Sequence, residues 1–345
     1  MSKKPNYISF LKENRTKEQA EEIFIQRIKD SEEVYRKFSK NFIERECPIC
    51  GETDYIECEK FNDQYGVVSC SKCSSIYVNP TPNLEALDFY YNQCECNKQY
   101  GSLLKKRVGK KGIILGERSS QVIKIIDELL KNKSRVNILE VGSNSGAFLY
   151  ELKQALSMNN CSDKVTLTGI DIDESAVNNP VDAEISLFHS SVEEFIEKSE
   201  QKFDLIMHFE LIEHLYNPYD FTCGLYKLLN KGGLMYFHTP NALGLDNRAL
   251  TYNDFRPLAH GIFPPMHLNA FTTQNISHFL IRCGFNIEKI ETPGNFDVDI
   301  VRQFCEVEND YSVINEINDE KSLAILQHVI KALGASSHLA VLASK

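Results

Sequence analysis

One stretch of ten residues, Asn137–Gly146, does most to restrict the folds open to this chain. It reads Asn-Ile-Leu-Glu-Val-Gly-Ser-Asn-Ser-Gly, and its apolar run ends at Glu140 and Val141. Such a run predicts a buried parallel strand. Gly142 then permits a tight turn, and Gly146 lets the next helix begin close against the strand. A strand, a glycine turn and a helix form a ligand cradle at the carboxyl end of a parallel sheet.

The residue types in this turn indicate which ligand it holds. A dinucleotide cradle needs G-x-G-x-x-G, but the middle position here is Asn144, and an acid, Glu140, precedes the two glycines. The pattern Glu140-x-Gly142-x-x-x-Gly146 resembles motif I of the class I S-adenosylmethionine (SAM) methyltransferases. An acid at the strand end suits the cationic amino-acid end of SAM. An ordinary strand-to-helix turn is the alternative. The resemblance implies that the cofactor contacts Glu140, Gly142, Ser143, Asn144, Ser145 and Gly146.

Charge and hydropathy restrict the partners and the location. The 38 basic and 48 acidic residues give a net charge of -10, opposite to that expected of a protein whose main partner is a nucleic acid. The first residues lack the apolar run of a signal peptide, and no stretch approaches the roughly 18 apolar residues of a membrane span. The sequence therefore predicts a cytoplasmic protein with a small-molecule acceptor.

The basic run Lys105–Lys111 is expected to be a solvated loop, with contact to a substrate phosphate or RNA as the alternative.

The cysteine spacing predicts a metal site. In a cytoplasmic chain, eleven cysteines favour metal binding over a disulfide framework. Four of them follow C-x2-C-x19-C-x2-C, the pattern of a zinc ribbon: Cys47, Cys50, Cys70 and Cys73. Because protein fills all four ligand positions, the zinc would be structural. Unrelated buried cysteines are the alternative, and Cys58, Cys94 and Cys96 are expected to be free thiols because their spacing fits worse.

Alternating helix and strand from Ser119 onward predict the fold class. Strands are expected at 135–141, 165–171, 183–188, 203–208, 234–239, 285–290 and 338–343, with 292–318 irregular. This alternation predicts an α/β fold with a doubly wound, mostly parallel, seven-stranded sheet of the Rossmann-like methyltransferase type, preceded by a small zinc ribbon. An amphipathic helix to about residue 43 is expected to pack on the main domain, or on a second subunit in a homodimer.

Further cofactor residues are expected at the ends of the second, third and fourth strands. Asp171 can accept hydrogen bonds from both ribose hydroxyls of a nucleoside, although a helix N-cap is the alternative. Ile172 follows it, and Ser191 and Val192 follow the third strand, where an adenine would lie. Two residues at the end of the fourth strand, Phe209 and Glu210, are expected to border the methionine and adenine region.

Three later segments extend the resemblance. Phe203–Pro218 is similar to the F-D-x-I…F-E-x-I-E-H segment of ubiquinone-methyltransferase-like enzymes, and Leu228–Asn241 is similar to their fifth strand. Pro265–Thr272 resembles the H-L-N-x-F-T segment of a subset common in bacterial polysaccharide and sugar-modification clusters. That subset often carries a zinc ribbon and a Y-x-N-P-x-P connector, like Tyr77–Pro82 here. The implied domains are a helical segment at 1–45, a zinc ribbon at 46–82 and a methyltransferase domain at 83–345, with 292–335 shaping the acceptor pocket.

Methyl transfer to a hydroxyl needs an aligned acceptor, exclusion of water and removal of a proton. Histidine is the default base near neutral pH, and His214 and His267 follow the fourth and fifth strands. Glu213 is expected to orient a histidine or the substrate, and a structural hydrogen bond is the alternative role of His214. His260 is a weaker candidate, and His238 is expected to be a core residue.

The sequence as a whole predicts a SAM-dependent methyltransferase with a structural zinc ion. The resemblance implies transfer to a hydroxyl of a sugar or sugar nucleotide in polysaccharide, glycan or natural-product biosynthesis, with nitrogen and carbon transfer left open. An RNA methyltransferase and a SAM-binding protein without activity are the competing readings.

Overall fold

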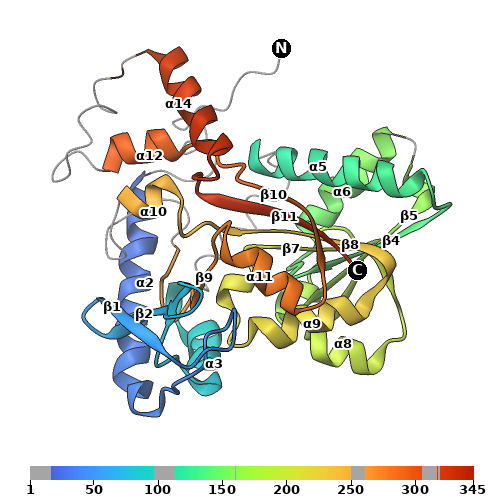
Figure 1. The fold of residues 1–345 in the computed structure, drawn as a ribbon. Coiled ribbons are helices and arrows are strands. Elements are labelled where there is room, and N and C mark those ends of the chain that lie inside the picture. The colour runs from blue at the N-terminus through green and yellow to red at the C-terminus, as the bar shows by residue number, and fades with distance from the viewer. Residues whose placement is uncertain (1–16, 97–112, 160, 250–260, 305–316, 318) are drawn as a thin grey trace.

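The computed structural model describes residues 17–96, 113–159, 161–249, 261–304, 317 and 319–345, and these form two sheets (Figure 1). One has four strands in the order β1-β2-β3-β9, and the other has seven in the order β10-β11-β8-β7-β4-β5-β6. The basic run Lys105–Lys111 and His260 lie outside the described residues. Among the described residues, no helix combines the length and apolarity needed to cross a bilayer.

The large sheet confirms the predicted fold class. Its strands are β4 (Val136–Val141), β5 (Val165–Asp171), β6 (Ser186–His189), β7 (Phe203–Phe209), β8 (Leu229–Pro240), β10 (Asn286–Glu291) and β11 (His338–Ser344). The five strands from β8 to β6 pair in parallel, whereas β11 is antiparallel to both β8 and β10. The sheet is therefore mostly parallel and Rossmann-like.

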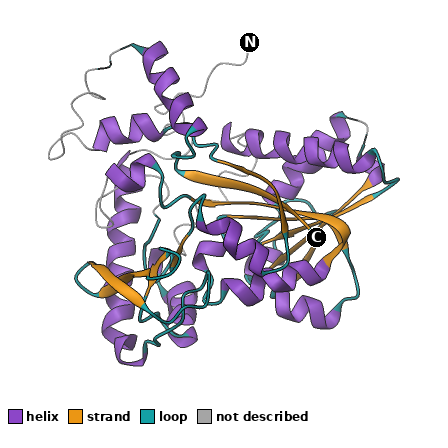
Figure 2. Cartoon of the chain, in the orientation of Figure 1, coloured by secondary structure: helices purple, strands orange, loops and turns teal. Residues whose placement is uncertain are grey.

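Helices cover both faces of this sheet, and the two faces form separate cores (Figure 2). On one face lie α5 (Ile113–Leu130) and α6 (Ala147–Met158), packed on side chains such as Ile138 and Leu205. On the other lie α8 (Val192–Lys198), α9 (Pro218–Leu228) and α11 (Asn275–Arg282), packed on their neighbours Leu139 and Ile206. Burial on both faces explains the continuous apolar runs of β4 and β7.

Three expectations differ from the structure. The third strand is Ser186–His189 rather than 183–188, and β8 begins at Leu229 because pairing with β7 continues through an irregularity at 203–205. Part of the segment expected to be irregular forms α12 (Asp297–Phe304). Asp297 is fully buried and accepts hydrogen bonds from Ser336 Oγ and Ser337 N, both at 2.6 Å, so these contacts hold α12 against the start of β11.

The small sheet contains β1 (Tyr55–Phe61), β2 (Tyr65–Cys70), β3 (Ile76–Val78) and β9 (Asn269–Ala270). Strand β3 pairs with β9, a segment almost 200 residues later, through Ile76↔Ala270 and Tyr77↔Asn269. The long helix α2 (Lys17–Phe38) and α3 (Leu84–Gln93) share a buried cluster with this sheet. In Figure 1 these elements lie beside the large sheet, near β9.

The remaining elements are short or peripheral. They are α7 (Glu174–Val177), α10 (Leu245–Ala249), α14 (Glu320–Ala332) and the 3-10 helices η1 (Ser39–Asn41), η2 (Ser162–Lys164) and η3 (Ile212–His214). Helix α14 leads directly to β11, the strand inserted between β8 and β10.

A fully buried histidine in β7 makes the fold sensitive to acid. His208 stacks on Phe237 with ring centroids 4.6 Å apart, and neither ring nitrogen has a hydrogen-bond partner within the described residues. Burial lowers the pKa of His208 to about 3. Since the unfolded chain binds this proton near pH 6.5 and the folded chain does not, stability is lost as the pH falls below 6.5.

Replacing this histidine should reduce the acid sensitivity. Between pH 7 and pH 5 the wild-type chain should lose about 2 kcal/mol more unfolding free energy than a His208→Phe variant. Urea unfolding at both pH values measures the difference, with His328→Ala, on the exposed side of α14, as the control. An equal pH dependence in wild type and His208→Phe would contradict this explanation.

Candidate functional site

The glycine turn after β4 has the geometry that its sequence predicts. Gly142 and Gly146 have φ angles of 74° and 77°, the left-handed region that favours glycine, and Asn144 also lies there at 49°. The amides of Gly142 and Ser143 donate to the carbonyl of Ile170 on β5. Ser143 Oγ is buried and makes no hydrogen bond with any described residue. The turn therefore offers a constrained backbone and an unused hydroxyl beside the sheet.

Glu140 places an unsatisfied carboxylate beneath this turn. It is 5% exposed, and its Oε2 has no hydrogen-bond partner among the described residues. Burial, reinforced by the charge of Asp171, raises the pKa of Glu140 well above its usual range, while Arg118 acts in the opposite direction. A cationic ligand against Oε2 would favour the ionised form. The site therefore fits the positively charged end of a ligand such as SAM.

Asp171, the last residue of β5, contacts the glycine turn from the neighbouring strand. Its Oδ2 accepts from Asn144 N at 2.7 Å, and its Oδ1 accepts from Asp173 N at 2.8 Å. The N-cap of α7 is Asp173, whose side chain accepts from Ala176 N, so Asp171 is not the cap. Each carboxylate oxygen keeps acceptor capacity for a hydroxyl group. Asp171 is thus held in position by the backbone with both oxygens able to accept one bond more.

The residues expected beside the adenine differ in their surroundings. Ile172 is 71% exposed, and Val192 is buried. Ser191 is the N-cap of α8, and its Oγ accepts from Glu194 N at 3.2 Å. Ser191 was expected to bond to the edge of the adenine base. Because its hydroxyl oxygen caps α8, part of its hydrogen-bonding capacity is already used. The exposed Ile172, which directly follows Asp171, offers an apolar surface next to the carboxylate.

An arginine that the sequence did not indicate lies at the end of β7. Arg118 Nη2 of α5 is 2.7 Å from Glu210 Oε1, and the guanidinium lies 5.0 Å from the ring centroid of Phe209. His338 Nε2 is 3.7 Å from the other oxygen of Glu210. Arg118 could not be singled out because it is one charged residue in an ordinary amphipathic helix. Glu210 is therefore paired with Arg118, and His338 lies near its second oxygen.

His214 and His267 come together although 52 residues separate them. Their ring centroids are 4.6 Å apart, with the ring planes nearly perpendicular. The H-L-N segment produces this contact, because Leu268 N donates to Glu213 O and Asn269 Nδ2 donates to Leu215 O. These bonds fix the segment carrying His267 against η3, which carries His214.

His214 is held as a neutral imidazole. Its Nδ1 lies 3.0 Å from the carbonyl of Met266 and 3.3 Å from the hydroxyl of Tyr91. The carbonyl can only accept, so Nδ1 carries the proton and Nε2 keeps its lone pair. Burial lowers the pKa of His214 to about 4. The arrangement therefore presents an unprotonated ring nitrogen of fixed orientation.

Glu213 lies against this nitrogen. Its side chain is 1% exposed, and Oε2 accepts from Thr239 Oγ1 at 2.9 Å. Oε1 has no hydrogen bond within the described part of the chain and lies 3.8 Å from His214 Nε2. Burial raises the pKa of Glu213 well above its usual range, and the charge of Glu210 adds to this effect. Glu213, His214 and His267 thus form one cluster, with one ligand atom of each within 4.8 Å of the others.

This cluster borders the glycine turn. Strands β4 and β7 are parallel neighbours, with Val141 paired to His208, so the residues that follow them meet at one edge of the sheet. Leu211, between Glu210 and η3, lies 3.3 Å from where a Cβ of Gly142 would be.

His238 is buried inside β8, as expected of a core residue, and bonds to the hydroxyl of Tyr236 at 2.8 Å.

Arg45 ties the small sheet to both histidine segments. Its guanidinium donates to the carbonyls of Val78, Tyr216 and Leu268. Burial lowers the pKa of Arg45 to about 10. The sequence did not indicate this role, since an arginine beside a cysteine knuckle reads as surface charge. Tyr216 lies two residues after His214, and Leu268 directly follows His267. Arg45 therefore holds the backbone next to both histidines.

The four predicted metal-ligating cysteines are neighbours in space. Their sulfur atoms lie within 4.8 Å of one another, with 3.6 Å between Cys47 and Cys73 and 3.5 Å between Cys50 and Cys70. Four sulfurs placed tetrahedrally about 2.3 Å from one ion would be about 3.8 Å apart. Gly51 follows the first pair with a φ of 75°. The cluster has the size and ligand type of a tetrahedral thiolate site.

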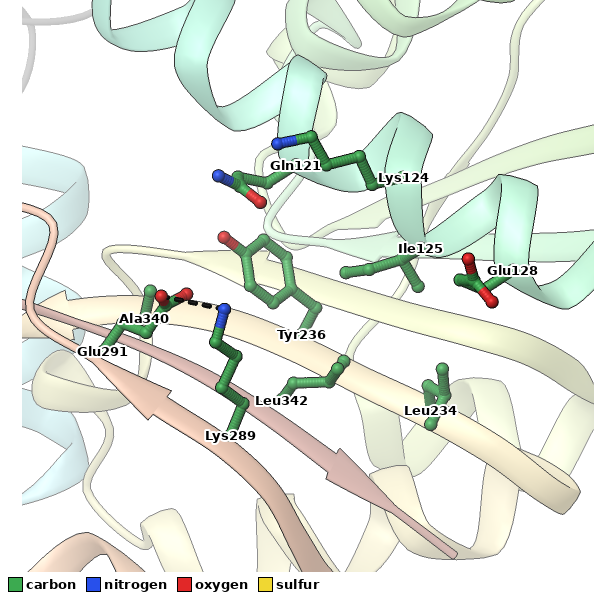
Figure 3. Close-up of a pocket in the computed structure, with 10 residues that line it drawn as sticks. All are labelled: Gln121, Lys124, Ile125, Glu128, Leu234, Tyr236, Lys289, Glu291, Ala340 and Leu342. Carbon is green, nitrogen blue, oxygen red and sulfur yellow. Dashed lines mark ion pairs between the residues drawn. The ribbon is translucent and has the colours of Figure 1, made fainter.

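A separate depression of about 250 Å³ lies between α5 and the strands β8, β10 and β11 (Figure 3). Tyr236 forms part of its wall, and an ion pair of 2.8 Å joins Lys289 to Glu291. None of the cofactor, acceptor or metal residues predicted from the sequence lines it. It lies between α5 and one face of the large sheet.

Comparison with known proteins defines the class of this chain. The sequence profile of a family described as "Methyltransferase domain" matches residues 114–290, just over half of the chain. The chain belongs to this methyltransferase family, and its class is that of the SAM-dependent methyltransferases.

Individual relatives are distant. A ubiquinone biosynthesis O-methyltransferase of Maricaulis maris (strain MCS10) is 38% identical over 58 residues, which are 17% of this chain and 23% of that protein. A SAM-dependent methyltransferase from Archaeoglobus fulgidus aligns with a TM-score of 0.45 and 16% identity, covering 71% of this chain and 100% of that one. The plantazolicin methyltransferase BamL, bound to a triazolic desmethylPZN analog and SAH, gives 0.48 and 16%, covering 75% and 93%.

Proposed function

We propose that this chain transfers the methyl group of SAM to a hydroxyl of a sugar or sugar nucleotide. The observation that carries the proposal is the Glu213–His214–His267 cluster, which lies beside the glycine turn at the end of β7. A neutral imidazole, a buried carboxylate and a second imidazole in one place are the groups needed to ionise a hydroxyl. The H-L-N-x-F-T resemblance and the net charge of -10 support a sugar over a nucleic acid.

The residues of the glycine turn, the Glu213–His214–His267 cluster and the four cysteines have separate roles in this proposal. Glu140 would hold the cationic end of SAM, and Asp171 would accept the ribose hydroxyls while the turn from Gly142 to Gly146 shapes the backbone around them. When bound, SAM supplies an electrophilic methyl group on a positively charged sulfur. Met266 O fixes the tautomer of His214, and the His214–His267 pair with Glu213 would ionise the acceptor hydroxyl. We propose further that Cys47, Cys50, Cys70 and Cys73 bind a structural Zn²⁺.

Labelled methyl transfer tests the acceptor class. The purified chain and SAM with an isotope-labelled methyl group would be mixed with cell extract, which is then separated into small anionic metabolites, polysaccharide and RNA. We expect label in the sugar-nucleotide or polysaccharide fraction with the wild type, and at least a hundredfold less with His267→Ala, on the order expected for loss of a catalytic base. Label chiefly in RNA, or SAM binding with no transfer to any fraction, would contradict the proposal.

A further inference from the structure

Two acceptor atoms of the Glu213–His214–His267 cluster, His214 Nε2 and Glu213 Oε1, are close neighbours. His214 Nε2 holds a lone pair because Nδ1 donates to Met266 O. Glu213 Oε1 is buried and makes no hydrogen bond with the described residues. The distance of 3.8 Å between the two atoms is too long for a hydrogen bond. Buried polar atoms are almost always satisfied, so Glu213 Oε1, which faces the lone pair of His214 Nε2, indicates a missing positive partner.

The spacing of the cluster fits a cation. Ligand atoms that each lie about 2.1 Å from one ion are about 3.0 to 4.2 Å apart, and the pair above falls within this range. His267, which is buried beside them, supplies a third ligand atom, and all three atoms lie within 4.8 Å of one another. Metal-binding histidines usually donate their second ring N–H to a carbonyl or carboxylate, as His214 does to Met266.

We propose that Glu213, His214 and His267 bind a divalent transition-metal cation that coordinates the acceptor oxygen. Two imidazoles and one carboxylate on a single side leave positions open for substrate or water. An acceptor with two adjacent hydroxyls, such as a sugar diol, can occupy two of these positions. The inference rests on the proposed methyl transfer and specifies how the cluster ionises the hydroxyl.

The chemistry balances without any further reactant. Coordination lowers the pKa of the acceptor hydroxyl, and its proton leaves to water. The oxygen then attacks the methyl carbon, so that an O–CH₃ bond forms as the S–CH₃ bond breaks. The bonding electrons return to sulfur, which becomes the neutral thioether of S-adenosylhomocysteine. One proton is released for each methyl group transferred.

Mn²⁺ is a suitable probe, because carboxylate and imidazole groups bind it whereas the four-thiolate cluster favours zinc. The intact chain would be titrated with Mn²⁺ while the electron paramagnetic resonance signal of free Mn²⁺ is recorded. We expect one site per chain in the wild type and in His328→Ala, the control histidine on α14. Glu213→Gln and His214→Ala should weaken Mn²⁺ binding by about tenfold or more. Retained SAM binding in each variant shows that it is folded.

Methyl transfer gives the second readout. Treatment with a chelator should abolish transfer, and added Mn²⁺ should restore it while the zinc content of the chain stays constant. Full transfer in the chelated protein, or no Mn²⁺ site in the wild type, would overturn the metal site and leave the proposed methyltransferase intact. Mn²⁺ binding that depends on Glu213 and His214, without transfer to any acceptor, would support the metal site and contradict the proposed function.

Discussion

An Asp171→Ala variant should bind SAM at least about tenfold more weakly than the wild-type chain, because it loses a pair of charge-assisted hydrogen bonds. The carboxylate has two tasks in the structure. It holds the amides of Asn144 and Asp173, and each oxygen keeps capacity for a ribose hydroxyl. Removing it therefore removes ligand contacts and also loosens the glycine turn that shapes the cofactor site.

Calorimetric titration with SAM or S-adenosylhomocysteine measures this effect, and two variants separate its parts. Asp171→Asn keeps an acceptor oxygen and loses the charge, so it should be intermediate. Asp173→Ala removes the N-cap of α7 but keeps the Asp173 amide that bonds to Asp171, so it should change cofactor affinity little. If Asp171→Ala binds SAM as tightly as wild type, Asp171 has no place in the cofactor site.

Replacing Cys70 by serine should abolish zinc binding and lower the unfolding free energy by about 4 kcal/mol or more, as is usual when a structural metal is lost. The loss of stability should extend beyond the four-cysteine cluster. Cys47 and Cys70 pack in the same buried cluster as Phe271 and Phe279, and β3 carries the pairing to β9. Loss of the ion therefore removes support from the segment that follows His267.

Zinc content by atomic emission and unfolding in urea measure the two effects together. Cys58→Ser is the matched control, because Cys58 is exposed and lies outside the four-cysteine cluster. It should keep one zinc per chain and wild-type stability. A Cys70→Ser chain with full stability would show that the cluster has no structural role, and a wild-type chain without zinc would contradict the assignment of the metal.

Local signals account for what the sequence predicted well. The turn from Gly142 to Gly146 needs left-handed backbone, and glycine records that need directly in the sequence. The strands β4 and β7 are buried on both faces, so they appear as continuous apolar runs. Both features depend on residues adjacent in the chain, and both lie where the motifs indicated.

The features that could not be predicted depend on distant partners. Strand β9 has two residues, too few for any periodicity, and exists because β3 lies beside it. Helix α12 depends on contacts of Asp297 with serines 39 and 40 residues later. Arg118 and Arg45 act on groups brought close only by the fold. Ser191 was expected at the base edge, but its side chain also caps α8.

The pairing of β3 with β9 also bears on how such a chain can be divided and recombined. The cysteine-bearing segment supplies a backbone partner to residues 269–270, and Arg45 reaches the carbonyl of Leu268. A fragment that begins at residue 83 would retain the glycine turn but lose both of these partners. A chimera that exchanges the ribbon between relatives should therefore exchange 261–272 with it. The ribbon and residues 261–272, which carry His267, form one transferable unit, although almost 180 residues of sequence separate them.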